Sequence, residues 1–465
     1  MEGISMWKKT EHFLDRPHSS KIFTWREIIN LMIPGILDNL SIMFIMMLIT
    51  ALISSNGETS VAAVALVSPI TALIGCMFNG IAAGGSVVVA QSMGKRDHIM
   101  VQRSIGAATV LTINVGVIIC IPFLISPFGI LPLLYPSAEA EVMEKAMTFL
   151  SGSIWSILSF IVFQACFNVL RGLGESKRCL VLSIIINVAY LLLSILFLNV
   201  LHMDIKGSVW ALILARTIGA ACAVTTLFFL HPPVKVQFRE MMRFGRSMTA
   251  YTLKLGLPLG FEQICLSLGN LVAEVYMILL GTAALATHAI GTSIMGLIFA
   301  PAMSAGNLAV AVVGRCIGAE EYEEAYRYGK VCTNISHVLM GLACLIAYPM
   351  LPILLKQYNP TAEAAAMATT LLWWSLPSLI LFFPNSNTMP AVLRAGSDTL
   401  YPSVVSMIVL WVFSIAMGYI LAIPAGLGLT GTWIAMWLGW AVRSTAFSFR
   451  FRSRMWLRMS KVKHA

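Results

Sequence analysis

The chain contains 465 residues, of which 58% are apolar and only 11% are charged. Soluble proteins carry roughly 25% charged residues, so this composition excludes an ordinary soluble domain and indicates helices that lie in lipid. The net charge of +10 is carried by short clusters between apolar runs, as in membrane-protein loops. Because no long basic stripe exists, we expect no nucleic-acid partner.

The N-terminal residues 1–27 are polar and mixed in charge, and they lack the apolar core and cleavage site of a signal peptide. We interpret them as a cytoplasmic tail that leads into the first helix around Trp25. The remaining chain is predicted to form an N-lobe (28–230), a cytoplasmic linker (231–249), a C-lobe (250–450) and a basic cytoplasmic tail (451–465).

Twelve apolar segments are long enough to cross a bilayer, which takes about 20 helical residues because hydrocarbon tolerates only internally bonded backbone. They predict an all-α membrane protein with 12 transmembrane helices. The segments are 28–54, 61–91, 104–126, 146–170, 179–200, 207–230, 250–280, 284–314, 329–351, 366–392, 400–423 and 428–449. Prolines inside them predict broken helices, at Pro34, Pro69, Pro258, Pro301, Pro377, Pro384 and Pro390.

Lysine and arginine are distributed unevenly between the loops. With the N-terminus inside, the basic clusters around Arg96, Arg171 and Lys254 face the cytoplasm together with both tails. The outer loops then hold only Lys145, Lys206 and Lys356. This asymmetry predicts a multi-pass protein of the plasma (inner) membrane with both termini in the cytoplasm.

The two halves of the chain resemble each other at a constant offset of 224 residues. Leu31-Met-Ile-Pro34 aligns with Leu255-Gly-Leu-Pro258, and Gly207-Ser-Val-Trp-Ala211 aligns with Gly431-Thr-Trp-Ile-Ala435. Each half holds six predicted spans, so both halves enter the membrane in the same direction. This pattern predicts a parallel repeat of two six-helix lobes, with substrate bound between the lobes.

Several segments resemble the MATE family of multidrug exporters. Gly84-Gly-Ser-Val-Val-Val-Ala-Gln91 is similar to the end of the family's second helix. Leu170-Arg-Gly-Leu-Gly174 and Leu393-Arg-Ala-Gly-Ser-Asp398 look like its loops after helices 4 and 10, and Leu427 to Met436 looks like its helix 12. The resemblance covers residues 28–455. It implies a secondary active antiporter that exports small organic, often cationic or amphipathic, compounds in exchange for H⁺ or Na⁺.

The carboxylates that this family uses for cation coupling are missing from the chain. Their positions hold Ile49, Leu191, Leu266 and Phe383, although Asn187 matches the asparagine of the family's helix-5 pair. The resemblance therefore leaves the coupling ion undetermined.

Asp38 and Glu262 are repeat-related acids inside the first and seventh spans, and each is followed by an amide, Asn39 or Gln263. A carboxylate near the bilayer centre costs about 2.5–3.5 kcal/mol on insertion scales, so it faces a cavity or a partner. One hypothesis is that Asp38 and Glu262 replace the missing carboxylates as proton or cation acceptors. The alternative is that they are water-facing acids near the cytoplasmic mouth or partners of an arginine or lysine.

Other polar residues inside the spans are weaker candidates. Glu274 is either an interfacial acid or a substrate counter-charge, and His288 is either a packed neutral histidine or a titrating switch. Gln164, Asn168 and Asn187 either line a cavity in the first lobe or join helices by hydrogen bonds. Arg216 is expected to have an acid partner, whereas the arginines at positions 171 and 394 are expected to organise cytoplasmic loops.

Enzyme activity is not expected, because the chain has no H-E-x-x-H, G-x-S-x-G or P-loop pattern. The nine cysteines occur singly, so we predict neither a metal site nor an organic cofactor. The favoured function is export of small-molecule substrates by a monomer embedded in the bilayer. The alternatives are a flippase for lipid-linked oligosaccharides, which would have a cationic cavity, a membrane-embedded enzyme and a channel.

Overall fold

The computed structural model describes residues 23–54, 58–125, 131–132, 135, 139–229, 236–356 and 361–461. The described residues form helices and their connections and contain no β-strand. Residues 1–22 of the predicted N-terminal tail, residues 231–235 of the predicted linker and residues 462–465 of the predicted C-terminal tail lie outside the described residues.

The first half of the chain, residues 23–229, forms six long helical segments. They are α2 (Trp25–Ser54), α3 (Glu58–Gly94), α4 (His98–Ile125), α6 (Ala140–Gly172), α7 (Ser176–Ser194) with its π-helical continuation η1 (Ile195–Val200), and α8 (Asp204–Phe228). Each coincides with one predicted span to within a few residues at its ends.

The second half, residues 236–461, repeats this order. After the short α9 (Phe238–Met241) come α10 (Arg246–Ile278), α11 (Thr282–Gly318), α12 (Tyr322–Lys356), α13 (Ala362–Ala395), α14 (Leu400–Val409) with η2 (Leu410–Met417) and α15 (Gly418–Ala422), α16 (Gly428–Arg452) and α17 (Met455–Lys461). Among the described residues, eleven helical segments are long and apolar enough to cross a membrane. The twelfth predicted span, 428–449, is the helix α16, whose composition is more polar.

Side chains at the loop ends start several of these helices. At the start of α2, the Glu27 backbone N–H donates to the Thr24 hydroxyl, while the Thr24 N–H donates to the Glu27 carboxylate at 2.8 Å. This reciprocal capping box satisfies two backbone donors that the first turn leaves free. Asp97 accepts from the Ile99 N–H at 2.9 Å before α4, and Thr361 caps α13 in the same way.

The prolines do not break the helices, so that expectation was wrong. Pro34, Pro258 and Pro301 lie inside the continuous helices α2, α10 and α11, and Pro377, Pro384 and Pro390 all lie inside α13. Neighbouring helices and local adjustments can satisfy the backbone carbonyls that a proline leaves free. The irregular turns instead occur at η1 and η2, in the two repeat-related helical segments that begin at Ser176 and Leu400.

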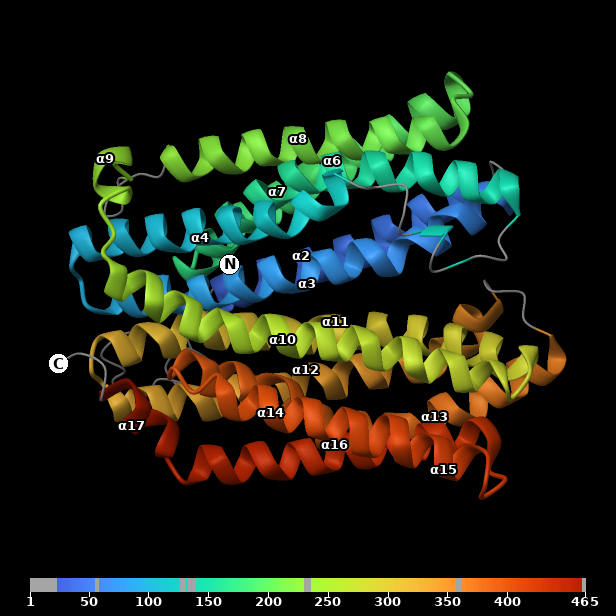
Figure 1. The fold of residues 1–465 in the computed structure, drawn as a ribbon. Helices are drawn as coiled ribbons and strands as arrows, with labels where there is room; N and C mark the ends of the chain where they lie inside the picture. The colour runs from blue at the N-terminus through green and yellow to red at the C-terminus, as the bar shows by residue number, and fades with distance from the viewer. Residues whose placement is uncertain are drawn as a thin grey trace, which may run out of the picture.

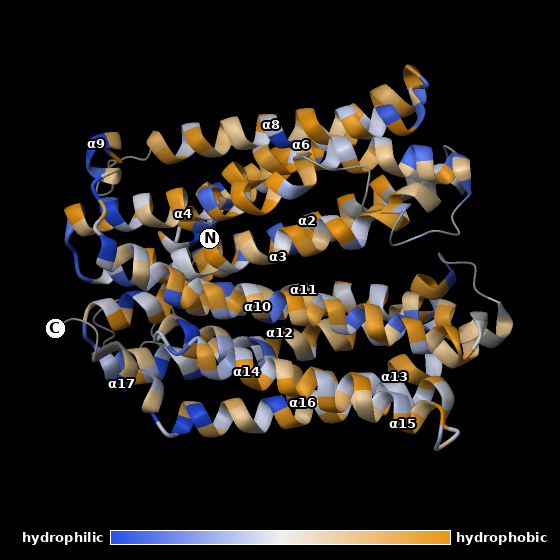
Figure 2. Cartoon of the chain, viewed as in Figure 1, coloured by the Kyte–Doolittle hydropathy of each residue, from blue (hydrophilic) through white to orange (hydrophobic). Residues whose placement is uncertain are grey.

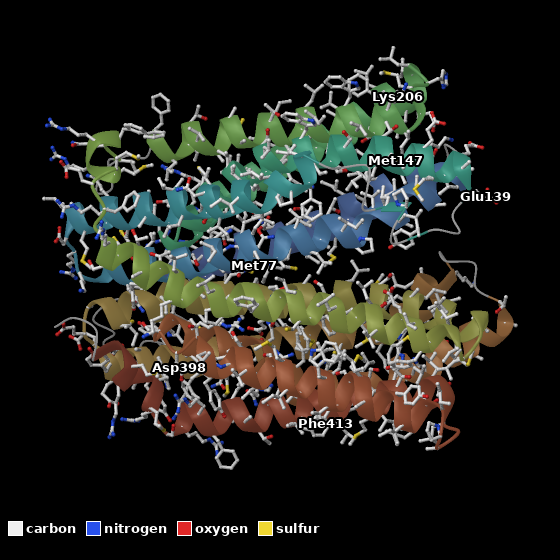
Figure 3. All side chains as sticks on the ribbon, viewed as in Figure 1. Met77, Glu139, Met147, Lys206, Asp398 and Phe413 are labelled. Atoms are coloured by element: carbon white, nitrogen blue, oxygen red, sulfur yellow. The ribbon has the colours of Figure 1, made fainter. Side chains whose placement is uncertain are left out.

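The two halves lie side by side as two helical bundles, with α2 to α8 in one and α10 to α16 in the other (Figure 1). Hydrophilic residues gather at both ends of the bundles, and hydrophobic residues cover the length between them (Figure 2). Lys206 and Asp398 lie toward opposite ends (Figure 3), as expected for an outer and an inner loop. This arrangement is the two-lobed membrane fold that the repeat predicted.

Glycines of α3 and α10 bring the two halves into close contact. A Cβ atom added to Gly84 would lie 2.6 Å from the Gly256 Cα, and one added to Gly80 would overlap the backbone of Gly260. Met77 of α3 lies against Gly260 on the same face (Figure 3). Only residues without a side chain permit two helix backbones to pack this closely, as is common between membrane helices.

Candidate substrate and ion sites

A cavity of about 450 Å³, here called the first-half cavity, lies among α3, α6, α7 and α8. Residues of α10 and α13 close one side of it. Its polar lining consists of amides, hydroxyls and three arginines, and none of its lining residues is an acid. The polar residues are Asn79, Gln164, Asn168, Arg171, Ser183, Asn187, Tyr190, Arg216, Gln263 and Arg394.

Arg216 lies at the middle of α8 and therefore near the centre of the predicted span. Its Nη1 donates to the Ser156 hydroxyl at 2.8 Å, and its guanidinium lies 4.5 Å from the centre of the Phe160 ring. Among the described residues, no carboxylate lies within 4.0 Å of the Arg216 guanidinium, so the expectation of an acid partner was wrong. A charge at this depth costs about 2.5–3.5 kcal/mol and requires a polar cavity, which the first-half cavity supplies.

Phenylalanines of α6 form one wall of this cavity. The rings of Phe160 and Phe163 stack at 6.0 Å, and those of Phe163 and Phe167 stack at 5.3 Å. Arg216 lies over the first ring of this strip and Arg171 lies over the last, at 4.8 Å from its centre. The spacing of three and four residues along α6 places these rings on one helix face. The cavity therefore has one aromatic wall, with an arginine at each end of it.

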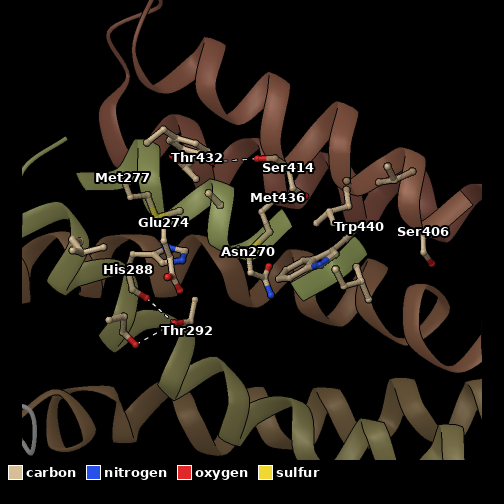
Figure 4. A pocket seen from close by; sticks show the side chains of 18 of the residues that line it. Asn270, Glu274, Met277, His288, Thr292, Ser406, Ser414, Thr432, Met436 and Trp440 are labelled. Atoms are coloured by element: carbon tan, nitrogen blue, oxygen red, sulfur yellow. Dashed lines mark hydrogen bonds between the residues drawn. The ribbon is translucent and has the colours of Figure 1, made fainter. Parts of the chain in front are cut away.

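A second cavity, of about 530 Å³ and here called the second-half cavity, lies among α10, α11, η2 and α16. Glu274 of α10 and His288 of α11 point into it, and Thr432, Met436 and Trp440 come from α16 (Figure 4). Asn270, Thr292, Ser414 and Arg443 also line it. Among the described residues, no cationic side chain lies within 4.0 Å of the Glu274 carboxylate, which distinguishes Glu274 from Asp38 and Glu262.

Several polar atoms around the second-half cavity are buried without a hydrogen-bond partner. They include His288 Nδ1, Ser406 Oγ, Thr432 Oγ1 and Arg443 Nε. Burying such atoms unsatisfied costs about 1–3 kcal/mol each, so this cavity is suited to a hydrated ion or a polar ligand. The described residues contain no group of three or more His, Cys, Asp or Glu side chains that could hold a metal ion.

The repeat-related acids Asp38 and Glu262 each pair with a repeat-related arginine. Arg394 donates to the Glu262 carboxylate at 2.6 Å, and the Ser403 hydroxyl donates to the same oxygen at 2.7 Å. Arg171 lies 3.5 Å from Asp38, whose other carboxylate oxygen is buried without a partner. Both acids are buried, at 4% and 3% exposed, so the structure supports the alternative in which they are partners of arginines.

Arg171 and Arg394 also lie on the two sides of the boundary between the halves. Both line a central cavity of about 350 Å³, together with Asn39, Asn168 and Asn307. Arg171 donates to the Asn307 side chain at 3.5 Å, which links α6 to α11. Although each arginine lies in the last turn of its helix, its side chain faces a cavity, so the expectation that these arginines organise loops was wrong.

The sequence-predicted polar residues thus fall into three places. Gln164, Asn168, Asn187 and Gln263 line the first-half cavity. Gln164 also joins two helices, as in the alternative interpretation, by donating to Asn79 of α3 at 2.7 Å, whereas Asn187 donates to the Ser183 carbonyl of its own helix at 2.8 Å. Asn39 lines the central cavity, and Glu274 and His288 line the second-half cavity.

Sequence reasoning missed the grouping of Arg171, Arg216 and Arg394 around one cavity. Each was visible as an arginine in or at the end of an apolar segment. However, their positions on α6, α8 and α13 gave no sign that the three side chains converge. It also missed Asn270, Arg443 and Trp440 of the second-half cavity.

Comparison with known proteins gives one consistent result. A family model described as MatE matches residues 34–196 and again 258–420. The probable multidrug resistance protein YoeA of Bacillus subtilis is 23% identical over 435 residues, covering 91% of this chain and 92% of that protein. The probable multidrug resistance protein NorM of Thermotoga maritima is 23% identical over 442 residues, covering 93% of each.

Comparison with solved structures finds transporters of the same family. A solved structure of a multidrug resistance MATE family transporter of the MOP superfamily, in its outward-facing conformation, matches with a TM-score of 0.81 and 20% identity. It covers 94% of this chain, and the match extends over 96% of that chain. Because the two segments matched by the family model make up more than half of the sequence and fall on the two repeats, the chain belongs to the MatE family of membrane transporters.

Proposed function

We propose that this protein is a secondary active exporter of small organic compounds, driven by the entry of H⁺ or Na⁺. One observation carries the proposal: a duplicated transporter chain has a separate cavity in each half, one lined by arginines and the other by an unpaired carboxylate and a histidine. Substrate and coupling ion can therefore occupy different sites. The relatives named as multidrug resistance proteins favour export of organic compounds.

Alternating access would occur at the contact between α3 and α10. Besides the glycine contacts, Gln91 of α3 donates to the Ala395 carbonyl at 2.7 Å and accepts from the Tyr251 hydroxyl at 2.9 Å. These contacts lie toward the end of α3 and the start of α10, which the distribution of lysine and arginine assigns to the cytoplasmic side. We expect these contacts to separate when the protein opens to the cytoplasm, with both termini on that side of the plasma membrane.

The second-half cavity is proposed to bind the coupling ion. We propose the Glu274 carboxylate as the ion ligand, because no arginine or lysine of the described residues lies within 4.0 Å of it, whereas Asp38 and Glu262 are already paired. The unsatisfied atoms of His288, Ser406 and Thr432 would bind the water or ion that accompanies it. We assign to Asp38 and Glu262 the role of holding the two interface arginines.

Transport by purified protein in proteoliposomes tests this proposal. The probes are two radiolabelled naphthalene compounds of opposite charge, 2-naphthalenesulfonate and 2-naphthyltrimethylammonium. We expect an imposed H⁺ or Na⁺ gradient to drive one of them against its concentration gradient, and expect an ionophore that collapses the gradient to abolish the movement.

The matched control is Glu139→Gln, which removes an exposed carboxylate before α6 and should leave this transport unchanged. Movement of a probe only down its own gradient, unaffected by the ionophore, would identify a facilitator and would contradict secondary active export. A lipid flippase is tested by the same vesicles if they carry a fluorescent anionic lipid.

A further inference from the structure

The phenylalanine strip of α6 in the first-half cavity has a guanidinium at each end. Arg216 covers the Phe160 ring at 4.5 Å, and Arg171 covers the Phe167 ring at 4.8 Å. An aromatic face attracts cations, but at both ends of this strip that face is already occupied by an arginine. A cationic ligand therefore finds no free end of the strip, whereas the N–H edges of the arginines are donors only and require acceptors.

The charges around this cavity do not balance. Three arginines line it, and two of them are paired with the acids Asp38 and Glu262. The third, Arg216, donates to a serine hydroxyl and lies over an aromatic ring, and it has no carboxylate partner within 4.0 Å among the described residues. The cavity therefore holds one uncompensated positive charge near the middle of the membrane span, where the low dielectric constant makes an unpaired charge most costly.

We propose that the first-half cavity binds an amphipathic organic anion: an aromatic or apolar body that carries a carboxylate, sulfonate or phosphate group. Arg216 binds the anionic group, because a guanidinium matches these planar or tetrahedral oxyanions in a fork of two N–H donors. The Phe160, Phe163 and Phe167 rings contact the body. This inference rests on the proposed function and names the substrate class of the exporter.

The size and shape of the cavity fit this class of ligand. Its volume of about 450 Å³ lies within the range of about 300–1,000 Å³ that is usual for pockets holding drug-sized compounds. A cationic compound of the same size would bring a second unpaired positive charge next to Arg216. Like charges at close range discriminate against the wrong ligand, so Arg216 sets specificity by repulsion as well as by attraction.

Binding of the two naphthalene probes to the purified protein in phosphatidylcholine nanodiscs tests this inference without any gradient. We expect the sulfonate to bind at least tenfold more tightly than the trimethylammonium compound. Replacing Arg216 by glutamine should weaken sulfonate binding about 10- to 100-fold, the usual effect of losing a hydrogen bond to a charged group. R216K, which keeps the charge, should retain most of the preference for the anion.

The matched control is R239Q, which removes one positive charge from an exposed position in α9 and should leave both affinities unchanged. Tighter binding of the ammonium compound to the wild-type protein would overturn the inference, and this comparison does not depend on any variant folding. Binding of neither probe would also overturn it. So would an R216Q variant that folds and binds the sulfonate as well as the wild type.

The anionic group can come from a soluble compound or from a lipid headgroup, and nanodiscs that contain phosphatidylglycerol separate the two sources. If this lipid weakens sulfonate binding in the wild type but not in R216Q, the natural ligand is a lipid phosphate; if it has no effect, the ligand is a soluble anion. Both results support an anion site. Failure of the exporter proposal is distinct: the sulfonate would then bind through Arg216, but no ion gradient would move it.

Discussion

The two halves of this transporter have the same succession of helices, yet their cavities differ in charged residues. The first-half cavity is lined by Arg171, Arg216 and Arg394 and contains no acid among its lining residues, whereas the second-half cavity is lined by an acid and an arginine, Glu274 and Arg443, together with His288. At the offset of 224 residues, Arg216 corresponds to Trp440. The residues that differ between the halves therefore give the two cavities different charged linings, and our proposals of an anion in one and a coupling ion in the other rest on this difference.

The acid–arginine pairs show the opposite behaviour, because both halves retain them. Asp38 with Arg171 and Glu262 with Arg394 are related by the repeat and lie near the boundary between the halves. The duplication has thus kept one acid–arginine pair inside each bundle, α2 with α6 and α10 with α13, while the cavity walls have diverged. In this chain the repeat-related acids are therefore paired with arginines, and the charges that differ between the halves are the ones we propose for binding.

The largest effect is expected from the Glu262→Gln substitution. It removes the partner of Arg394, which bonds to Glu262 at 2.6 Å, and breaking a buried pair of this kind costs about 3 kcal/mol. Asp38→Asn should cost only about 1 kcal/mol, because its pair is longer, at 3.5 Å, and the net value of a hydrogen bond is of that order. Thermal unfolding measured with a thiol-reactive dye suits this test, because most of the cysteines are buried.

Glu139→Gln, at an exposed position, is the control for both substitutions. Equal shifts of the unfolding temperature for Glu262→Gln and Asp38→Asn would show that the two pairs contribute alike. The difference between the two pair distances, 2.6 Å and 3.5 Å, would then not change the stability that each pair contributes.

A charge reversal at Arg216 would place an acid in the first-half cavity, as Glu274 does in the second-half cavity. In Arg216→Glu, we expect the ratio of sulfonate to ammonium affinity to change by about a hundredfold, in favour of the ammonium compound, since attraction and repulsion exchange places. Equilibrium binding in nanodiscs measures this ratio. If the ammonium compound still binds no better than the sulfonate to the folded variant, Arg216 does not determine the charge preference.

Neutralising Glu274 is expected to separate the roles of the two cavities. Glu274→Gln should lower gradient-driven transport of the substrate about tenfold, because the ion-accepting group is lost, while binding of the sulfonate stays within about twofold of the wild type. Parallel measurements of transport in proteoliposomes and binding in nanodiscs check both parts. A variant that loses binding and transport together would place the substrate at Glu274 and contradict the division between cavities.

The smallest effect is expected from His288→Gln. His288 lines the second-half cavity, and its Nδ1 atom has no hydrogen-bond partner. Glutamine preserves a polar group there, so transport driven by a fixed gradient should fall only about two- to threefold, as for loss of one auxiliary contact. A loss as large as that of Glu274→Gln would instead make His288 an essential part of ion coupling.

Much of the fold could be predicted from the sequence, because hydropathy acts locally. A stretch of apolar residues such as 61–91 or 329–351 has to form a helix across the bilayer whatever surrounds it, and both stretches lie inside helices of the structure. The repeat could be predicted as well, because landmarks such as Pro34 and Pro258 keep their spacing. The same prolines misled the prediction of broken helices, since packing with neighbouring helices decides whether a helix continues through a proline.

The candidate sites were predicted only in part. Gln164, Asn187, Glu274 and His288 were recognised because polar groups inside apolar segments are costly and require a cavity or a partner. The partner of Asp38 was not identified, because Arg171 lies on another helix and far away in sequence. The same reason explains why Arg394 was assigned to a loop, although its side chain bonds to Glu262.

The sequence by itself determined the class of membrane protein, the approximate positions of the long helices and the duplication, because these follow from apolar length and from landmarks that recur along the chain. Only the tertiary structure decided which charges are neutralised and which are free. Arg171 and Arg394 pair with acids on other helices, while Arg216 donates to Ser156 and lies over the Phe160 ring without a carboxylate within 4.0 Å among the described residues. Electrostatic compensation depends on distances of a few ångströms between side chains of different helices, and such distances are set by packing.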